Sequence, residues 1–187
     1  MMTFLPTDYK PPAASGGNYT KFAQGKTTLR IIGDSSKGTA IFGWLGWTEE
    51  GDKRMPVRSV DKPASGTFAE KPKHFWAFLV LNEGDVQICE LVQRGIQDAL
   101  RELIADPDWG DLKHYDVCIQ RDGKGLDTTY TVIPKPKAEL SESDIAVIRE
   151  KLPKINMAAL YEGEDPFAEL TVSDVFDKAE GDDDLPY

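Results

Sequence analysis

Short runs of alternating apolar and polar residues fill the middle of the chain and predict β-strands. The first run is KTTLRII, in which Leu29 and Ile31 lie on one side of an extended chain while Thr28 and Arg30 lie on the other. The run TAIFGWLGWTEE alternates in the same way, and its two glycines mark places where a strand can bend or bulge. Both segments are therefore predicted strands.

Two further strand pairs are predicted downstream. KHFWAFLVLN and DVQICEL are separated by Glu83 and Gly84, a hairpin signal, and YDVCIQR is joined to DTTYTVIP by the glycine-bearing turn DGKGL. Before these pairs, residues 51–72 are polar, basic and broken by prolines. They predict a long loop that carries at most a short strand at PVRSV.

One helix is predicted between the strand pairs, from about Val92 to Asp106. Its apolar residues, among them Ile96, Leu100 and Ile104, recur at the helical spacing and form a single stripe. We expect these six runs to build an OB-fold barrel of five principal strands, with the helix between the third and the fourth. The predicted fold class is thus mainly β with some α, built on a five-stranded OB-fold barrel.

The ends of the chain have a different character and divide it into four parts. Residues 1–25 contain PP and SGG and predict an irregular arm, which can still anchor through Phe4, Leu5 and Tyr9. Residues 26–137 make up the barrel, and 138–161 a short extension in which SESDIAVIREKL has an N-cap serine and predicts an amphipathic helix. Residues 162–187 form an acidic tail.

The formal net charge of −10 comes entirely from the last fifty residues. Residues 1–137 carry 18 Lys and Arg against 18 Asp and Glu, whereas residues 138–187 carry 4 against 14. In the tail, ten acids accompany one base. Such a segment cannot bury enough apolar surface to offset its ordering entropy, so we expect it to be solvated and extended.

Composition also argues against several classes of protein. No apolar run reaches the roughly 18 residues of a membrane span, and the first residues lack the pattern of a secretory signal, so we expect a cytoplasmic protein without a membrane partner. The chain has two cysteines, Cys89 and Cys118, and two histidines, His74 and His114. The cysteines are too few for a disulfide framework, and the four residues are too scattered in the sequence to predict a metal site. We expect no cofactor.

An enzyme is a weaker interpretation of the sequence. Asp106, Asp108 and Asp111 surround Trp109 and have the oxygen ligands that Mg²⁺ prefers, but acids at the end of a helix more often form a polar turn. The sequence has no glycine-rich phosphate loop, nucleophile elbow or Cys-His arrangement. We therefore expect no catalytic activity.

Aromatic and basic residues recur close together along the predicted strands. Binding of single-stranded nucleic acid needs both, because cations neutralise phosphates and flat rings stack on unpaired bases. Each residue alone has an ordinary explanation as core or as solvated surface, and their coincidence is what carries the prediction. The predicted DNA-binding residues are Lys26, Arg30, Phe42, Trp44, Trp47, Arg54, Arg58, Lys73, His74, Trp76, Arg121 and Lys124.

The final residues read DDDLPY and are similar to the C-terminal peptide of single-stranded DNA-binding proteins, which characteristically ends in an Asp-Asp-(Ile/Leu)-Pro-Phe type sequence. The matching residues are Asp182, Asp183, Asp184, Leu185, Pro186 and Tyr187. Tyrosine replaces the usual phenylalanine, which keeps the ring and adds a hydroxyl group that needs a hydrated or hydrogen-bonding partner.

The body resembles the OB-fold single-stranded DNA-binding proteins of tailed bacteriophages. The resemblance is carried by FLPTDYK, SGGNYTKF, KHFWAFLV, ADPDWGD, YDVCIQRDGKGLDTTYTV and EGEDPFAEL. It implies a protein that coats single-stranded DNA in replication, recombination and repair, and whose tail recruits phage or host replication proteins such as a polymerase, helicase or primase. A tethered polyanion would also compete with DNA for a basic groove.

An acidic protein that mimics DNA and occupies a nucleic-acid enzyme is the alternative. Such a protein would spread carboxylates over its folded body, whereas residues 1–137 are balanced in charge. Quenching of tryptophan fluorescence by oligo(dT), reversed by salt, would separate strand binding from mimicry.

Overall fold

The computed structural model describes residues 17–51 and 53–168, which form a β-rich structure with three α-helices. The strands are β1 (Gly25–Ile31), β2 (Ala40–Glu50), β3 (Lys53–Ser59), β4 (Lys73–Asn82), β5 (Asp85–Leu91), β6 (Tyr115–Asp122) and β7 (Thr129–Lys137). The α-helices are α1 (Arg94–Ala105), α2 (Glu142–Lys151) and α3 (Ala159–Glu162). Single-turn 3-10 helices are η1 (Ser35–Lys37), η2 (Leu112–His114), η3 (Gly125–Asp127) and η4 (Leu152–Lys154).

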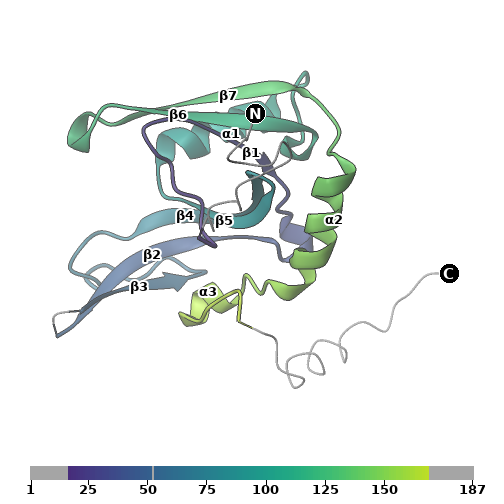
Figure 1. Cartoon of the computed structure of the whole chain (residues 1–187). Helices are drawn as coiled ribbons and strands as arrows, with labels where there is room; N and C mark the ends of the chain where they lie inside the picture. The colour runs from purple at the N-terminus through teal and green to yellow at the C-terminus, as the bar shows by residue number, and fades with distance from the viewer. Residues whose placement is uncertain (1–16, 52, 169–187) are drawn as a thin grey trace, which may run out of the picture.

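All seven strands belong to one antiparallel sheet. Its order is β3-β2-β4-β1-β6-β7, and β5 pairs with β4 outside this path. Strand β4 is central because one of its edges pairs with β2 over residues 73–78 and with β1 at residues 80–81, while its other edge pairs with β5. In Figure 1 strands β1, β6 and β7 lie above the other four, so the sheet doubles back over a shared interior.

The predicted mainly β class with helices is confirmed, but the predicted count of five strands is wrong. The sheet has seven strands and is open, and closure into an OB-fold barrel is not confirmed. Part of the predicted long loop is strand β3, which pairs with β2 from Trp44–Ser59 to Glu50–Lys53. The loop itself is shorter and spans residues 60–72.

The strand hairpin and the helix were predicted correctly. Glu83 and Gly84 join β4 to β5 with φ values of 51° and 78°, as a tight turn with two left-handed residues requires. Helix α1 begins two residues later than predicted and ends one earlier. Ile96 and Leu100 of its apolar stripe are buried, but Ile104 is 52% exposed.

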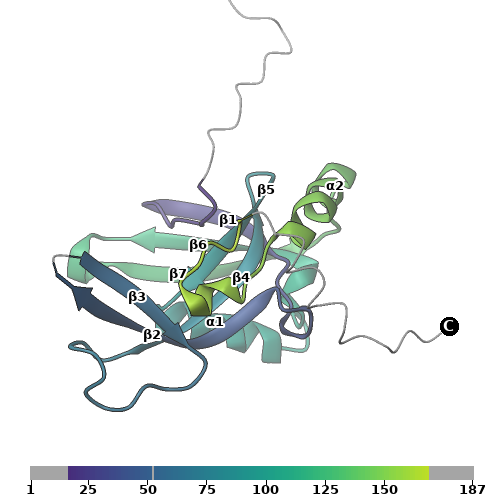
Figure 2. The same ribbon diagram turned by 90° about the horizontal axis from the view of Figure 1, so that it is seen from below.

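Two apolar cores lie on the two sides of strand β4, which explains why its sequence is an almost unbroken apolar run. Phe78 and Val80 face the core that α1 covers, together with residues of β1, β5 and β6. Phe75, Ala77 and Leu79 face the other core, which residues of α2, η4 and α3 cover. In Figure 1 helix α3 lies below β2 and β3, and Figure 2 shows it in front of the sheet when the molecule is seen from below.

The described part of the predicted N-terminal arm is attached to the sheet. Tyr19 forms a parallel bridge with Ile88, and backbone hydrogen bonds of 2.8 Å join Thr20 N–H to Ile88 O and Ile88 N–H to Asn18 O. Residues 18–20 thus cover the free edge of β5. The predicted anchors Phe4, Leu5 and Tyr9 lie outside the described residues. None of the described helices is long and apolar enough to cross a bilayer.

Candidate nucleic-acid interface

Four rings form a ladder on one face of the neighbouring strands β2 and β4. The antiparallel register pairs Phe42 with Trp76 and Trp44 with His74. Because side chains alternate along a strand, both pairs point to the same face, opposite Ile41 and Leu45. The ring centroids are 5.7 Å apart in the first pair and 5.4 Å in the second, both edge to face. Phe42 is 41% exposed.

Beside this ladder, strand β4 and helix α1 border a groove of about 650 Å³, which we call the basic groove. Trp44, His74 and Trp76 form its aromatic wall. Asp98 is the one carboxylate among its lining residues, whereas five lining residues are Lys or Arg. These cations are Lys62, Lys71, Lys73, Arg94 and Arg101.

Gln97 fixes the helix that forms the other wall of the basic groove. Its side-chain Nε2 donates hydrogen bonds to the backbone oxygens of His74 at 3.2 Å and Leu91 at 2.9 Å. Gln97 is buried, so the loss of these bonds would leave a desolvated amide without partners. The contact holds α1 at a fixed distance from the ring ladder.

The two helix arginines are available to a ligand. Arg94 and Arg101 share Asp98, at 3.4 Å and 3.5 Å, and both arginine side chains are largely exposed. Exposed ion pairs of this kind contribute roughly 0–1 kcal/mol, so a phosphate can replace the carboxylate at little cost. Residues 94 and 101 lie two helical turns apart on one side of α1.

The segment 60–72 folds onto the same face as the ring ladder. Lys62 places its ammonium 5.1 Å from the ring centre of Trp44, a cation–π contact. Phe68 lies against Gly46, where an added Cβ would come within 2.3 Å of the phenyl ring. A side chain at position 46 would therefore push this segment away from the groove.

Three predicted binding residues lie on the opposite face of β2 or on its partner strand. Trp47 packs with the core that α2 and α3 cover, and Arg54 lies 4.8 Å above its ring while pairing with Glu70 at 2.7 Å. Arg58 pairs with Glu90 at 2.8 Å in a largely buried contact. The structure does not bring these three residues to the basic groove.

Arg30 also lies away from the basic groove. Only 5% of its surface is exposed, and its Nε donates to Asp116 Oδ1 at 2.6 Å while Nη1 donates to the backbone oxygen of Lys113 at 3.3 Å. These contacts join β1 to β6 and η2. The guanidinium is committed to the fold rather than free to neutralise a phosphate.

The other predicted cations do not line the basic groove. Lys26 is exposed on β1, Lys124 is exposed in the β6–β7 turn, and Arg121 donates to the backbone oxygen of Phe22 at 2.9 Å. The predicted tail residues 182–187 lie outside the described residues. Trp44, Lys73, His74 and Trp76 therefore meet in the groove, with Phe42 beside them.

Sequence reasoning missed the helix wall of the groove. Arg94 and Arg101 lie on the polar side of the predicted helix, and their seven-residue spacing was a signal that they share one face. Lys62 and Lys71 lie in the predicted loop, where sequence alone gives no direction to a side chain. Gln97 had no signal, because its role depends on strand backbone oxygens.

Acidic residues around Trp109 form a polar turn. Asp106 accepts from the backbone N–H of Asp108 at 2.8 Å, and Asp111 accepts from that of Lys113 at 2.9 Å. Within residues 17–51 and 53–168, no group of three His, Cys, Asp or Glu side chains is arranged to hold a metal ion.

The basic groove therefore combines aromatic surfaces for stacking, exposed cations and a helix wall that Gln97 joins to the strands. Comparison with protein-family models, with curated proteins and with solved structures found no match for this chain.

Proposed function

We propose that this protein binds single-stranded DNA in the basic groove, whatever the base sequence, and so protects it. The proposed setting is phage replication and recombination in the host cytoplasm. One observation carries the proposal: Trp44 and Trp76 line a groove together with five Lys and Arg side chains. Bases stack on the rings and phosphates contact the cations, as strand binding requires. The antiparallel sheet doubles back on itself and α1 lies between two hairpins in the chain, an arrangement that favours an OB-fold as the architecture of this protein.

The ring ladder is suited to unpaired bases rather than to a duplex. Phe42 and Trp76 present ring edges and faces on a strand surface, where a base can stack only after leaving its helix. Cations of α1 and of the segment before β4 line the same groove as the rings, so that a backbone can follow the groove while its bases turn toward the sheet. Catalysis forms no part of this proposal.

Fluorescence titration tests the function. Oligo(dT) is expected to quench tryptophan emission, with reversal by salt, and Trp44→Ala or Trp76→Ala is expected to weaken binding about tenfold because each stacked base contributes roughly 1–3 kcal/mol. Trp47→Phe, on the opposite face, is the matched control and should leave affinity unchanged.

A gel shift should show preference for single over double strands. No binding of oligo(dT) by the intact chain would refute the proposal and favour the acidic mimic.

The acidic tail is proposed to compete with DNA for the basic groove and to recruit replication proteins. Its carboxylates belong to the same chain as the cationic groove, so they would reach the groove at a high effective concentration. Removing residues 168–187 is expected to raise affinity for oligo(dT) several-fold at about 20 mM salt, with the gain fading as salt screens the charges. Fluorescence anisotropy with labelled oligo(dT) measures this. Equal or weaker binding by the shortened chain would argue against competition.

A further inference from the structure

A second cavity opens next to the basic groove, on the other side of Trp76. It has a volume of about 430 Å³, within the usual range for small-ligand sites. Trp76 lines both spaces. The remaining wall is mostly apolar and comes from β1, β2, β4, α1 and η2, with Ile31, Phe42, Phe78, Leu100, Ile104 and Leu112 as its main residues. We call this space the side cavity.

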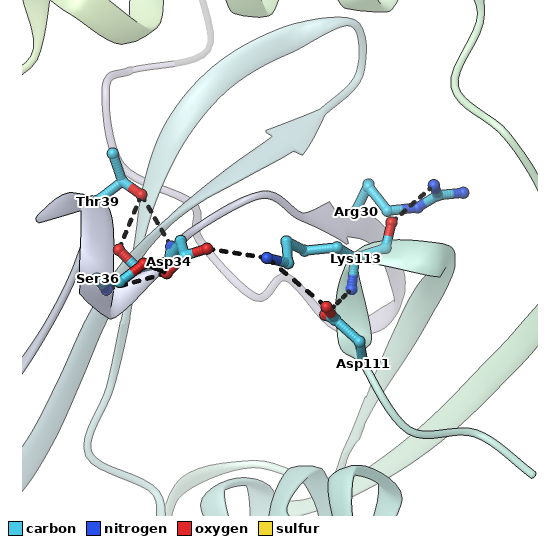
Figure 3. Close-up of polar contacts among 6 residues, drawn as sticks. All are labelled: Arg30, Asp34, Ser36, Thr39, Asp111 and Lys113. Atoms are coloured by element: carbon cyan, nitrogen blue, oxygen red, sulfur yellow. Dashed lines mark hydrogen bonds and ion pairs between the residues drawn. The ribbon is translucent and has the colours of Figure 1, made fainter. Parts of the chain in front are cut away.

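The rim of the side cavity carries two carboxylates and one ammonium. Lys113 Nζ lies 2.9 Å from Asp34 Oδ2 and 3.6 Å from Asp111 Oδ2, and Figure 3 shows the lysine reaching between the two acids. With one cation against two anions, the rim is net negative. It therefore disfavours a phosphate group and equally an acidic peptide such as the tail.

The rim is held in place by the turn between β1 and β2. Asp34 Oδ1 accepts from the Ser36 backbone N–H at 2.9 Å and from Ser36 Oγ at 2.6 Å, while Asp34 N–H donates to Thr39 Oγ1 at 2.8 Å. The Ser36 hydroxyl and the Lys113 ammonium hold the pKa of Asp34 well below its usual range. Asp34 is therefore an ionised acceptor at neutral pH, and its position is fixed before any ligand arrives.

We propose that the side cavity holds one nucleobase of the strand in the basic groove, with a preference for bases that carry an exocyclic amine. This inference rests on the proposed function. A nucleobase is flat, uncharged and aromatic, which suits a cavity walled by Phe42, Trp76 and Phe78. Adenine, cytosine and guanine present amine donors to the carboxylates at the rim, whereas thymine presents carbonyl oxygens at those positions.

The geometry also separates the base from its backbone. The cations of the basic groove lie on one side of Trp76 and the acidic rim of the side cavity lies on the other. A phosphate is attracted to the basic groove and repelled from the acidic rim. The phosphate therefore stays in the groove, and only the base reaches beyond Trp76 into the side cavity. Binding in the groove stays independent of sequence, and the side cavity adds a composition preference at one position.

Filling the side cavity tests the inference. Ile104 is 52% exposed at the cavity, so Ile104→Trp enlarges an exposed side chain without overpacking a core. Ala105→Trp adds the same ring to the exposed neighbouring position and is the matched control. Competition against labelled oligo(dT) should show that the unchanged chain and Ala105→Trp prefer oligo(dC) by at least about threefold. Ile104→Trp should lose this preference and bind oligo(dT) within about twofold of the unchanged chain.

A second probe keeps this inference distinct from the proposed function. Deoxycytidine carries no phosphate, and at millimolar concentration it should shift the methyl NMR signals of Ile31 and Leu112 in the full chain but not in Ile104→Trp. If oligonucleotides fail to bind while these shifts appear, the proposed function is wrong, whereas the assignment of a nucleobase to the side cavity is supported. If oligo(dT) binds while deoxycytidine causes no shift, the side cavity proposal is overturned. Methyl signals that respond only to removal of residues 168–187 would assign the cavity to the tail and also overturn it.

Discussion

Replacing Lys73 and Arg101 together with glutamate is expected to weaken binding to oligo(dT) roughly a hundredfold at low salt. The two cations lie on β4 and α1, on opposite walls of the basic groove, so the double variant removes phosphate contacts on both sides and adds repulsion. For single strands, each lost contact lowers the dependence of log affinity on log salt by about 0.7, so two lost contacts should lower that slope by about 1.4. Fluorescence titrations at four or five salt concentrations measure both quantities.

The matched control places the same charge change on the far side of the sheet. Arg149→Glu and Lys154→Glu lie on α2 and η4, which cover the core opposite the ring ladder, and both side chains are exposed. This pair should change affinity no more than about threefold, through net charge alone. If both double variants weakened binding equally, the basic groove would have no special role and general attraction would explain the interaction.

Replacing Arg58 with methionine is expected to lower the free energy of unfolding by about 3 kcal/mol without changing DNA affinity. Arg58 pairs with Glu90 at 2.8 Å, and the two side chains are only 12% and 22% exposed. Loss of the arginine leaves a poorly hydrated carboxylate without its partner, which is the costly way to break such a pair. Urea unfolding followed by circular dichroism measures the stability, and titration of the folded variant with oligo(dT) measures the affinity.

Two further variants isolate the effect of the buried charge. Arg58→Met combined with Glu90→Leu should recover most of the lost stability, because no unpaired charge remains. Arg54→Met breaks an exposed pair with Glu70 and should cost only about 1 kcal/mol. The opposite pattern for Arg58→Met, with stability retained and DNA affinity lost, would restore the binding role that the sequence suggested for this arginine.

Hydrophobic periodicity predicted most of the fold because most elements bury one clear face. Strand β3 was predicted only as a possible short strand at PVRSV within a loop. It ends the sheet and pairs only with β2, so little of it is buried and its sequence remains polar. Pro56 within it also argued for a loop, although a proline is tolerated on an edge strand. The glycines of β2 were interpreted as bends, yet the β2–β3 register runs through Gly46 without a shift, and this glycine instead makes room for Phe68.

The ring wall of the candidate site followed from sequence, whereas its cations followed only in part. Trp44 and Trp76 alternate with buried residues, and alternation fixes the face of a strand side chain. Arg30 also lies on a strand, but its role depends on Asp116, which is 86 positions away and becomes a neighbour only through the pairing of β1 with β6. A sequence shows that a cation is present, but only the fold shows whether that cation already forms a salt bridge with a carboxylate of the same chain.

Under the proposed function, the attachment of residues 18–20 to β5 bears on how neighbouring molecules behave when they coat one DNA strand. It leaves β3 and β7 as the outermost strands of the described sheet, and both carry prolines and lysines, with Pro56 and Lys53 on one and Pro134 and Lys135 on the other. Such residues discourage strand-to-strand fusion between molecules. Protein molecules packed densely along a DNA strand would then not join through their sheet edges into insoluble aggregates.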